Sequence, residues 1–364
     1  MALGLPSIEI AFKSKSITAI ERSKRGIVAL ILKESDMKKF PASPYTVYGT
    51  TDVPEGLSDE NKEQIELTLM GYQTTPKHIL VYVQDETAAD YNENLLELLH
   101  ARWDYLVIPK IDDADVQKIA TWIKSTRTIA DKMVKAVLPN CPADFEGVVN
   151  FTNTKIVTKA KEYTTAQYCS RIAGIICGTP MAISCTYAPL PEVVDCDKYI
   201  KDQMDEKVGK GELFVIFDGR KYKIARGVNS LITTTQDKND SFKKIKLIDC
   251  MDMIHDDIKD TTNESYIGKY ANSYDNKCLL ISAIQGYYMQ LEIDGLLDKG
   301  KNDCQIDLES QKAYLLSNGD YTKAELAEAK DQEIKEANTR DKVFLSANIK
   351  ILDAIEDVKL GVAV

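Results

Sequence analysis

The length, composition and charge of the chain exclude several classes of protein. Of its 364 residues, 44% are hydrophobic and 28% are charged, which is typical of a folded globular protein and not of a disordered or fibrous one. The 46 basic and 56 acidic residues give a net charge of −10. Nucleic acid and anionic membrane surfaces both require clustered cations, so neither is an expected partner. At roughly 150 residues per domain, we expect two or three domains.

The cysteines and the uncharged segments point to a protein that is made in a cytoplasm. None of the eight cysteines forms a C-x-x-C pair, so we expect reduced cysteines that serve as small hydrophobic residues. Lys13 and Lys15 interrupt the only candidate for a secretory signal. Residues 172–191 carry no charge and are long enough to span a bilayer. Their glycines and prolines instead favour a buried helix, a turn at residues 178–180 and a strand, without membrane insertion.

In chain order, residues 1–25 form a predicted N-terminal extended arm. Ile8, Ile10 and Phe12 alternate with small or polar residues, which is the pattern of a strand with one apolar face. Arg22, Lys24 and Arg25 then make the end of this arm basic.

Residues 26–194 alternate strand and helix patterns and predict an α/β domain. The apolar runs that we expect to be strands are residues 27–32, 78–83, 105–109, 136–138 and 148–151. The helical patterns begin at residue 58 or 59, at residue 87 or 90 and at residue 112 or 113, and they end near residues 69, 101 and 126. Strands joined by helices of this length indicate βαβ units and a partly parallel sheet.

Residues 195–345 change character and predict a C-terminal core domain of the α+β class, with a mixed sheet and helices. Residues 212–218 and 221–226 form a hairpin pattern around Asp218-Gly219, and residues 232–235 are a possible further strand. The expected helices are residues 242–258, residues 276–297 and a charged helix at residues 321–338.

Residues 346–364 are predicted to be a C-terminal arm. At its end, apolar residues alternate with Lys359, Gly361 and Ala363. These apolar residues are Val358, Leu360, Val362 and Val364. Free chain ends are normally polar unless something holds them. Two apolar, strand-like ends are therefore the most informative feature of this sequence.

Motifs of catalysis are missing from the sequence. His78, His100 and His255 are far apart in the chain. His255 and Asp256 are adjacent on a predicted helix and should point in different directions, so we expect a solvated helix face and no metal site. The glycines of residues 174–178 and 207–212 lack the spacing of a phosphate-binding loop. We therefore predict no catalytic residue, no cofactor and no metal.

Several long segments resemble contractile tail sheath proteins of phages. The likeness covers nearly the whole chain, is strongest over residues 165–295 and is weakest over residues 40–150. The segments that carry it are residues 211–235 (GELFVIFDGRKYKIARGVNSLITTT), 243–259 (KKIKLIDCMDMIHDDIK), 266–285, 343–358, 171–193 and 5–13. The chain looks most like the short sheath proteins of defective prophages and phage-tail-like bacteriocins.

The resemblance implies a structural subunit that polymerises as stacked hexameric rings around an inner tail tube protein. Such a sheath meets baseplate and tail terminator proteins, and its contraction drives the tube through the target cell envelope. It belongs to a virion or phage-tail-like particle that is assembled in the bacterial cytoplasm and released on lysis. In this family the arms of neighbouring subunits join a sheet in a third subunit. The residues assigned to inter-subunit strand exchange are Ile8, Ile10, Phe12, Val358, Leu360, Val362 and Val364.

Two alternatives remain open from the sequence. One is a soluble α/β ligand-binding enzyme, which the missing motifs and the apolar chain ends disfavour. The other is the inner tube or another tail component, which the length of the chain disfavours because tube subunits are much shorter.

Overall fold

The computed structural model describes residue 20, residues 25–40 and residues 42–363. The described residues group into two compact units. Residues 25–256 and 351–363 form the large unit, and residues 257–350 form the small unit. The four-part division predicted at residues 25, 194 and 345 stays a prediction.

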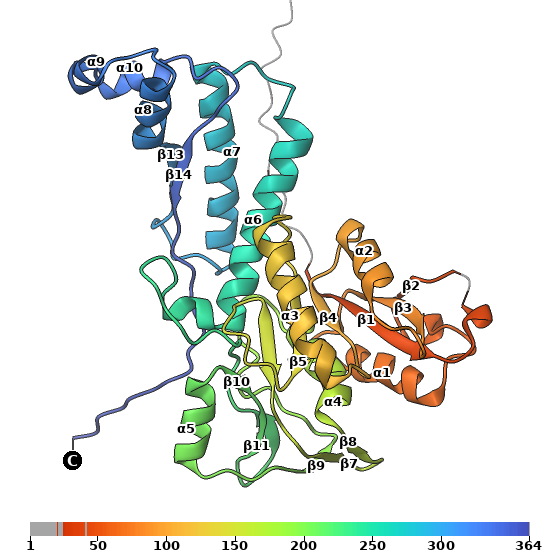
Figure 1. Cartoon of the computed structure of the whole chain (residues 1–364). Coiled ribbons are helices and arrows are strands. Elements are labelled where there is room, and N and C mark those ends of the chain that lie inside the picture. Colours follow the sequence, from red (N-terminus) through yellow and green to blue (C-terminus); the bar gives the residue numbers. More distant parts are fainter. Residues whose placement is uncertain (1–19, 21–24, 41, 364) are drawn as a thin grey trace, which may run out of the picture. The chain divides into compact units, whose positions relative to one another are not determined.

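A seven-stranded sheet lies at the centre of the large unit, in the order β10-β6-β5-β4-β1-β3-β2 (Figure 1). Its strands are β1 (Ile27–Glu34), β2 (Tyr45–Val47), β3 (His78–Asp85), β4 (Tyr105–Val107), β5 (Lys135–Pro139), β6 (Val148–Phe151) and β10 (Glu212–Leu213). Every neighbouring pair is parallel except β2 and β3. The expected partly parallel sheet and the mixed α/β class are confirmed.

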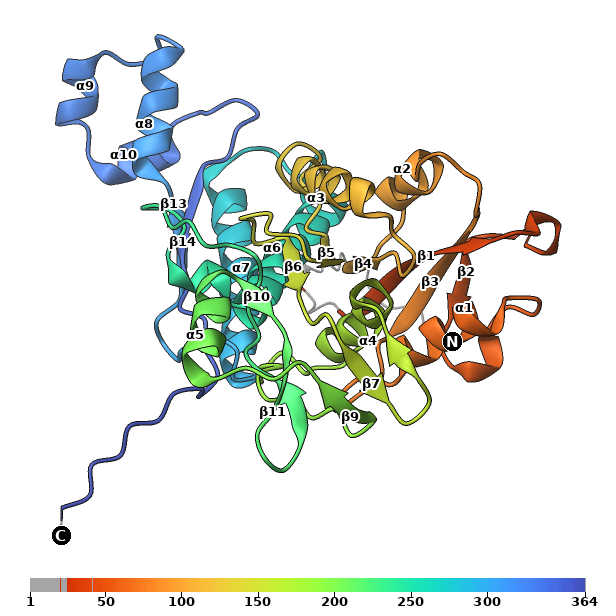
Figure 2. The ribbon, with the colours of Figure 1, turned by 60° about the horizontal axis from the view of Figure 1, so that its bottom comes forward.

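Helices cover both faces of this sheet, as Figure 2 shows. They are α1 (Asp59–Leu69), α2 (Asn92–His100), α3 (Asp113–Thr128) and α4 (Thr165–Cys177). Side chains alternate along a strand. The even-numbered residues of β1 from 28 to 32 therefore pack with α1 and α4, and its odd-numbered residues from 27 to 31 pack with α2 and α3. Burial on both faces explains why β1 is apolar without alternation.

The rest of the large unit consists of short elements. They are the 3-10 turns η1 (Met37–Lys39), η2 (Thr50–Asp52) and η3 (Asp240–Lys243), the antiparallel sheet of β7 (Ile156–Thr158), β8 (Glu162–Tyr163) and β9 (Val193–Cys196), helix α5 (Lys201–Gly209), and the hairpin of β11 (Val215–Phe217) and β12 (Tyr222–Ile224). The hairpin turns at Asp218-Gly219 as predicted.

Three strand predictions in this unit are wrong. Residues 212–218 are not one strand, because the Asn153 side chain accepts the N–H of Val215 at 2.6 Å where pairing with β6 would continue. Residues 232–235 form no strand, because the Asp144 carboxylate accepts the N–H groups of Ile232 and Thr233. The strand predicted after the turn at residues 178–180 is also absent. The chain bends there instead, since the Ser184 hydroxyl accepts the N–H of Thr186 at 3.1 Å.

The small unit contains helices and a two-stranded ribbon. Helix α6 (Ile245–Ser265) begins in the large unit and ends in this one. It is followed by α7 (Tyr274–Ile293), β13 (Asp303–Ile306), α8 (Leu308–Ser317), α9 (Lys323–Glu328), α10 (Asp331–Glu336) and β14 (Leu345–Asn348). Among the described helices, none is both long and apolar enough to cross a membrane.

The predicted charged helix at residues 321–338 is wrong, because it is divided into α9 and α10. Each half has its own start signal: the Glu325 carboxylate accepts the N–H of Thr322, and the Glu333 carboxylate accepts the N–H of Lys330. The hydrogen bond at Lys330 therefore begins a new helix, α10. Leu315, Leu326 and Ile334 pack together and hold the halves against α8.

Candidate inter-subunit interface

The described part of the C-terminal arm exposes its apolar side chains. Val358, Leu360 and Val362 are 79%, 83% and 73% exposed. Residues 358–363 belong to no strand, and the trace that ends at the mark C extends away from its unit (Figures 1 and 2). These side chains therefore complete no core of the large unit. Ile8, Ile10, Phe12 and Val364, which were assigned to the same exchange, lie outside the described residues.

The ribbon of β13 and β14 is a sheet of two strands. In the part of the chain that the structure describes, each of these strands pairs only with the other, so neither outer edge carries a further strand. Hydrogen-bonded and non-bonded residue pairs alternate along an antiparallel ladder. The bond from Asp307 N–H to the Phe344 carbonyl, at 3.0 Å, fixes this alternation. It follows that the backbone groups of Cys304 and Ile306 on β13 point outward, and so do those of Leu345 and Ala347 on β14.

One observation supports this orientation. The Gln285 side chain on α7 donates to the Cys304 carbonyl at 3.0 Å, which is possible only where that carbonyl turns away from β14. Cys304 and Ile306 are also buried on one face of the ribbon. The ribbon is thus fixed along one face by its own unit, whereas the outward groups of Leu345 and Ala347 have no partner among the described residues.

Sequence reasoning identified the exposed arm but missed the ribbon. The only signals were the alternation of Val343 and Leu345 and a weak alternation in β13, where Cys304 and Ile306 are buried and their neighbours are exposed. Runs of four residues are too short to stand out from loops. The pairing joins residues that lie about 40 positions apart, which no local pattern reveals.

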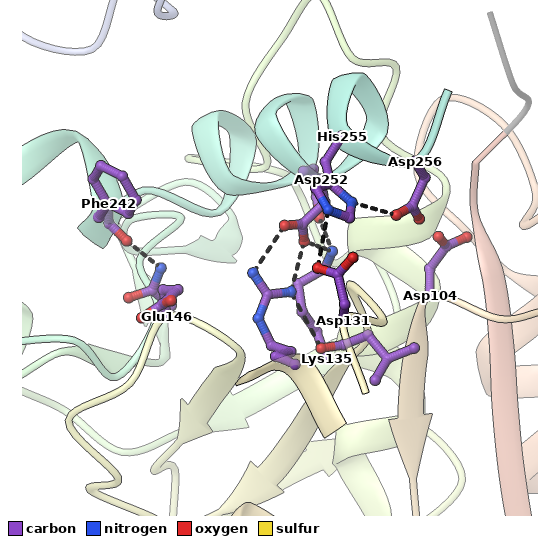
Figure 3. Close-up of polar contacts among 12 residues, drawn as sticks. Asp104, Asp131, Lys135, Glu146, Phe242, Asp252, His255 and Asp256 are labelled. Carbon is purple, nitrogen blue, oxygen red and sulfur yellow. Dashed lines mark hydrogen bonds and ion pairs between the residues drawn. The ribbon is translucent and has the colours of Figure 1, made fainter. Parts of the chain in front are cut away.

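In the large unit, a buried cluster of charged side chains surrounds Asp252 of α6 (Figure 3). The two Asp252 carboxylate oxygens accept from both terminal nitrogens of Arg127 at 2.8 and 2.9 Å. Lys135 on β5 donates to the same carboxylate at 2.5 Å. Burial alone would raise the pKa of Asp252, but Lys135 and Arg127 outweigh it and lower that pKa to about 2. Asp252 is therefore charged at every physiological pH.

The neighbouring Asp249 completes the cluster. Its carboxylate lies 3.0 Å from the Lys135 ammonium and accepts the Tyr105 hydroxyl at 2.8 Å. Burial raises the pKa of Asp249, and the nearby Lys135 opposes that rise. The cluster joins β4, β5, α3 and α6 through filled hydrogen bonds. Among the described residues, no group of three or more His, Cys, Asp or Glu side chains is placed to hold a metal ion.

The expectation that His255 and Asp256 point in different directions is wrong, and the helix face is only partly solvated at His255. Its Nδ1 lies 2.8 Å from the Asp256 carboxylate and its Nε2 lies 3.1 Å from that of Asp131, and the side chain is one-third exposed. Adjacent helical side chains can meet in this way because the imidazole of His255 turns toward the next residue (Figure 3). The ring thereby links α6 to the loop that follows α3.

Comparison with known proteins bears directly on this interface. The family model of the phage tail sheath protein central domain matches residues 84–230, and that of the phage tail sheath C-terminal domain matches residues 237–364. The tail sheath protein of Clostridium phage phiCD119 is 40% identical over 99% of both chains. The C-terminal domain model and this relative both include the region of the ribbon and the C-terminal arm.

Solved structures share the fold. The sheath tail protein of Desulfitobacterium hafniense aligns with a TM-score of 0.69 and 20% identity over 83% of this chain and 94% of its own. The contracted helical sheath of the anti-feeding prophage aligns with a TM-score of 0.69 and 13% identity over 100% and 99%. With its two matched domains and a full-length relative, this chain belongs to the phage tail sheath protein family and is a structural subunit of a contractile tail sheath, not an enzyme.

Proposed function

We propose that this subunit polymerises into stacked hexameric rings around an inner tail tube protein, between baseplate and tail terminator proteins. Contraction of this sheath drives the tube through the target cell envelope. The particle is a virion or phage-tail-like particle, assembled in the bacterial cytoplasm and released on lysis. The observation that carries the proposal is the exposed apolar C-terminal arm in a chain that also has a ribbon whose two strands pair with no further strand among the described residues.

The arms connect neighbouring subunits by strand exchange. Each edge of the β13–β14 ribbon accepts one strand from another copy, by main-chain hydrogen bonds to outward groups such as those of Leu345 and Ala347. The donors are residues 358–364 with Val358, Leu360, Val362 and Val364, and the N-terminal strand with Ile8, Ile10 and Phe12.

The energetics favour ordering of the arm only in the assembly. Burying four such side chains contributes at most roughly 6–12 kcal/mol, and fixing seven backbone residues costs roughly 7–14 kcal/mol. These two terms nearly cancel for one arm. Ladder hydrogen bonds of roughly 0.5–1.5 kcal/mol each and the high local concentration of a docked neighbour then make ordering favourable. Ordering and polymerisation are therefore coupled.

Truncation tests the proposal. Deletion of residues 358–364 should leave a folded subunit with an unchanged circular dichroism spectrum that forms no sheaths in negative-stain micrographs. Amide exchange of residues 358–363 should be fast in the free subunit and slow in the wild-type sheath. Regular sheaths from the truncated chain, or slow exchange in the free subunit, would refute strand exchange.

A matched pair of substitutions tests the apolar face. Val362→Asp places a carboxylate on the face that is buried after exchange and should prevent polymerisation. Ala363→Asp places the same group one residue further on, on the opposite face of a strand, and should impair polymerisation much less. Equal effects of the two changes would show that the arm docks without strand geometry.

A further inference from the structure

We propose that Glu356 is a positioning residue that fixes the root of the C-terminal arm to the large unit, and that helix α6 and the residue just before it hold the roots of both arms. The free part of the C-terminal arm then begins at Val358. This inference rests on the proposed strand exchange for its purpose, but its geometry belongs to the single subunit.

Glu356 lies in a socket of four polar side chains. Its Oε1 accepts the Thr186 hydroxyl at 2.6 Å and the Ser184 hydroxyl at 3.0 Å. Its Oε2 lies 3.1 Å from the Arg226 guanidinium and 3.3 Å from the Lys244 ammonium. The side chain of Glu356 is only 7% exposed, although it lies eight residues from the end of the chain. A buried carboxylate whose two oxygens both have hydrogen-bond donors or cations as partners holds its chain segment firmly in place.

The backbone around the socket is shaped to receive this carboxylate. Thr186 Oγ1 also accepts the N–H of Gly227 at 2.9 Å, which fixes the threonine hydroxyl. A Cβ atom at position 227 would lie 2.8 Å from Cys185 Sγ and 3.2 Å from Ser184 Oγ. Only glycine fits there without moving the segment that binds Glu356.

The residues just before Glu356 are held as well, whereas the next residue is not buried. Lys246 of α6 donates to the Leu352 carbonyl at 2.5 Å, and Lys244 pairs with Asp353. Asp357 pairs with Arg226 at 2.7 Å, but its side chain is 77% exposed. Val358 is 79% exposed. The attachment therefore ends within two residues.

The groups around Glu356 favour its charged form. Burial alone would raise the pKa of Glu356, but the Thr186 hydroxyl, Lys244, Ser184 and Arg226 together hold it below its usual value. Lys246, Asp353 and Asp357 are further charged groups near this carboxylate.

The N-terminal arm has an attachment of the same kind at Arg25. The Arg25 guanidinium donates to Asp104 at 2.7 Å, to Asp256 at 2.6 Å and to the Asp252 carbonyl at 2.6 Å. The other Asp104 oxygen accepts the N–H groups of Gly26 and Ile27, both at 2.8 Å. Asp252 and Asp256 belong to α6, so the arm is joined to that helix directly before β1 begins.

The two attachments are close along one rigid element. Lys244 and Asp252 are eight residues apart, which is about 12 Å of helix. Buried salt bridges around Asp252 fix the same stretch of α6 to the central sheet. A rotation of the large unit is consequently passed to both arms at once, and neighbours connected by these arms have to follow.

The test is limited proteolysis by proteinase K of unassembled full-length subunits isolated by size-exclusion chromatography. Glu356→Gln removes the charge, and cleavage within residues 352–357 should speed up by about 10-fold or more, as expected for lost charge-assisted hydrogen bonds. Asp357→Asn is the matched control and should change cleavage by less than about 3-fold, because that pair is exposed. Thr186→Val should act like Glu356→Gln, and Thr186→Ser, which keeps the hydroxyl, should restore slow cleavage.

The N-terminal attachment has its own readout. Arg25→Gln should speed up exchange of the Gly26 and Ile27 amides, which depend on the orientation of Asp104, and Glu356→Gln should leave them unchanged. In polymerisation assays, Glu356→Gln should raise the critical concentration about 10-fold or more, with an unchanged urea midpoint of the subunit.

Unchanged cleavage within residues 352–357 in both Glu356→Gln and Thr186→Val would overturn the inference. So would wild-type polymerisation of Glu356→Gln in a protein whose deletion of residues 358–364 abolishes sheaths. If that deletion leaves sheaths intact, strand exchange is refuted, and the cleavage rates in free subunits still decide whether Glu356 anchors the chain.

Discussion

The central sheet of the large unit and the ribbon of the small unit differ in their edge strands. The central sheet has seven strands and finishes at β2 and β10, which have only three and two residues. Short outer strands leave little backbone for another chain to pair with. The β13–β14 ribbon has only two strands, and among the described residues neither strand pairs with a further strand, although the Gln285 side chain occupies the outward Cys304 carbonyl of β13.

This difference separates stability from assembly. The large unit buries its strands under helices on both faces and joins α6 to the sheet through the Asp252 cluster, so its stability comes from its own chain. A two-stranded ribbon is marginal alone, and here it depends on packing by its unit. The strands added in the proposed exchange would stabilise it further. We expect changes in the first region to affect unfolding, and changes in the second to affect polymerisation alone.

The largest effect should follow from Ala347→Pro in β14. Proline removes an N–H that points away from β13, so the subunit should fold normally, but a docking strand loses its hydrogen bond and clashes with the ring. We expect complete loss of sheaths by electron microscopy. Ala347→Ser keeps the N–H and should assemble like the wild type. Sheaths from the proline variant would show that this edge of the ribbon stays free in the assembly.

Asp252→Asn should lower the stability of the large unit by about 3–5 kcal/mol, because it leaves Arg127 as a buried cation without its carboxylate and leaves Lys135 with Asp249 alone. Urea unfolding followed by tryptophan fluorescence measures this, since Trp103 and Trp122 both lie in the large unit. Asp240→Asn is the control: its pair with Lys243 is exposed, and the expected loss is less than about 1 kcal/mol. Equal losses of stability in the two variants would mean that the buried cluster stabilises the large unit no more than an exposed ion pair does.

Acid should remove part of the Asp252 contribution. Its pKa is about 2 in the folded protein, below its ordinary value of 3.8. A lowered folded-state pKa stabilises the protein above the unfolded-state value, and this stabilisation is lost as pH falls toward 2. The stability difference between wild type and Asp252→Asn should therefore be constant above about pH 4 and should narrow below it. A difference that is independent of pH down to 2 contradicts this assignment.

The smallest effect is expected for His255→Gln. The ring is partly exposed and bridges two carboxylates at the rim of the cluster, so its loss should cost no more than about 1 kcal/mol. Sheath formation should be nearly normal. Folded, well-assembled particles that fail to contract would reveal a role for this residue that its contacts do not explain.

Much of the large unit could be predicted because its signals are local. The apolar run of β1, the Ser58 side chain that accepts the N–H of Asn61 at the start of α1, and the Asp218-Gly219 turn each act within a few residues. The prediction failed where side chains from distant segments took the backbone hydrogen bonds, as Asn153 does at Val215 and Asp144 does at Ile232. Local propensity contains no information on such partners.

The sequence by itself determined that apolar residues alternate with period two at both chain ends, which is the pattern of a strand, because alternation is a property of consecutive residues. It also determined the family, through long similar segments. Only the tertiary structure decided where an arm can dock and where it is held. The outer edges of β13 and β14 arise from a pairing across about 40 residues. The socket of Glu356 unites residues from 184 to 356, and folding brings these together only because helices and sheet pack around one core.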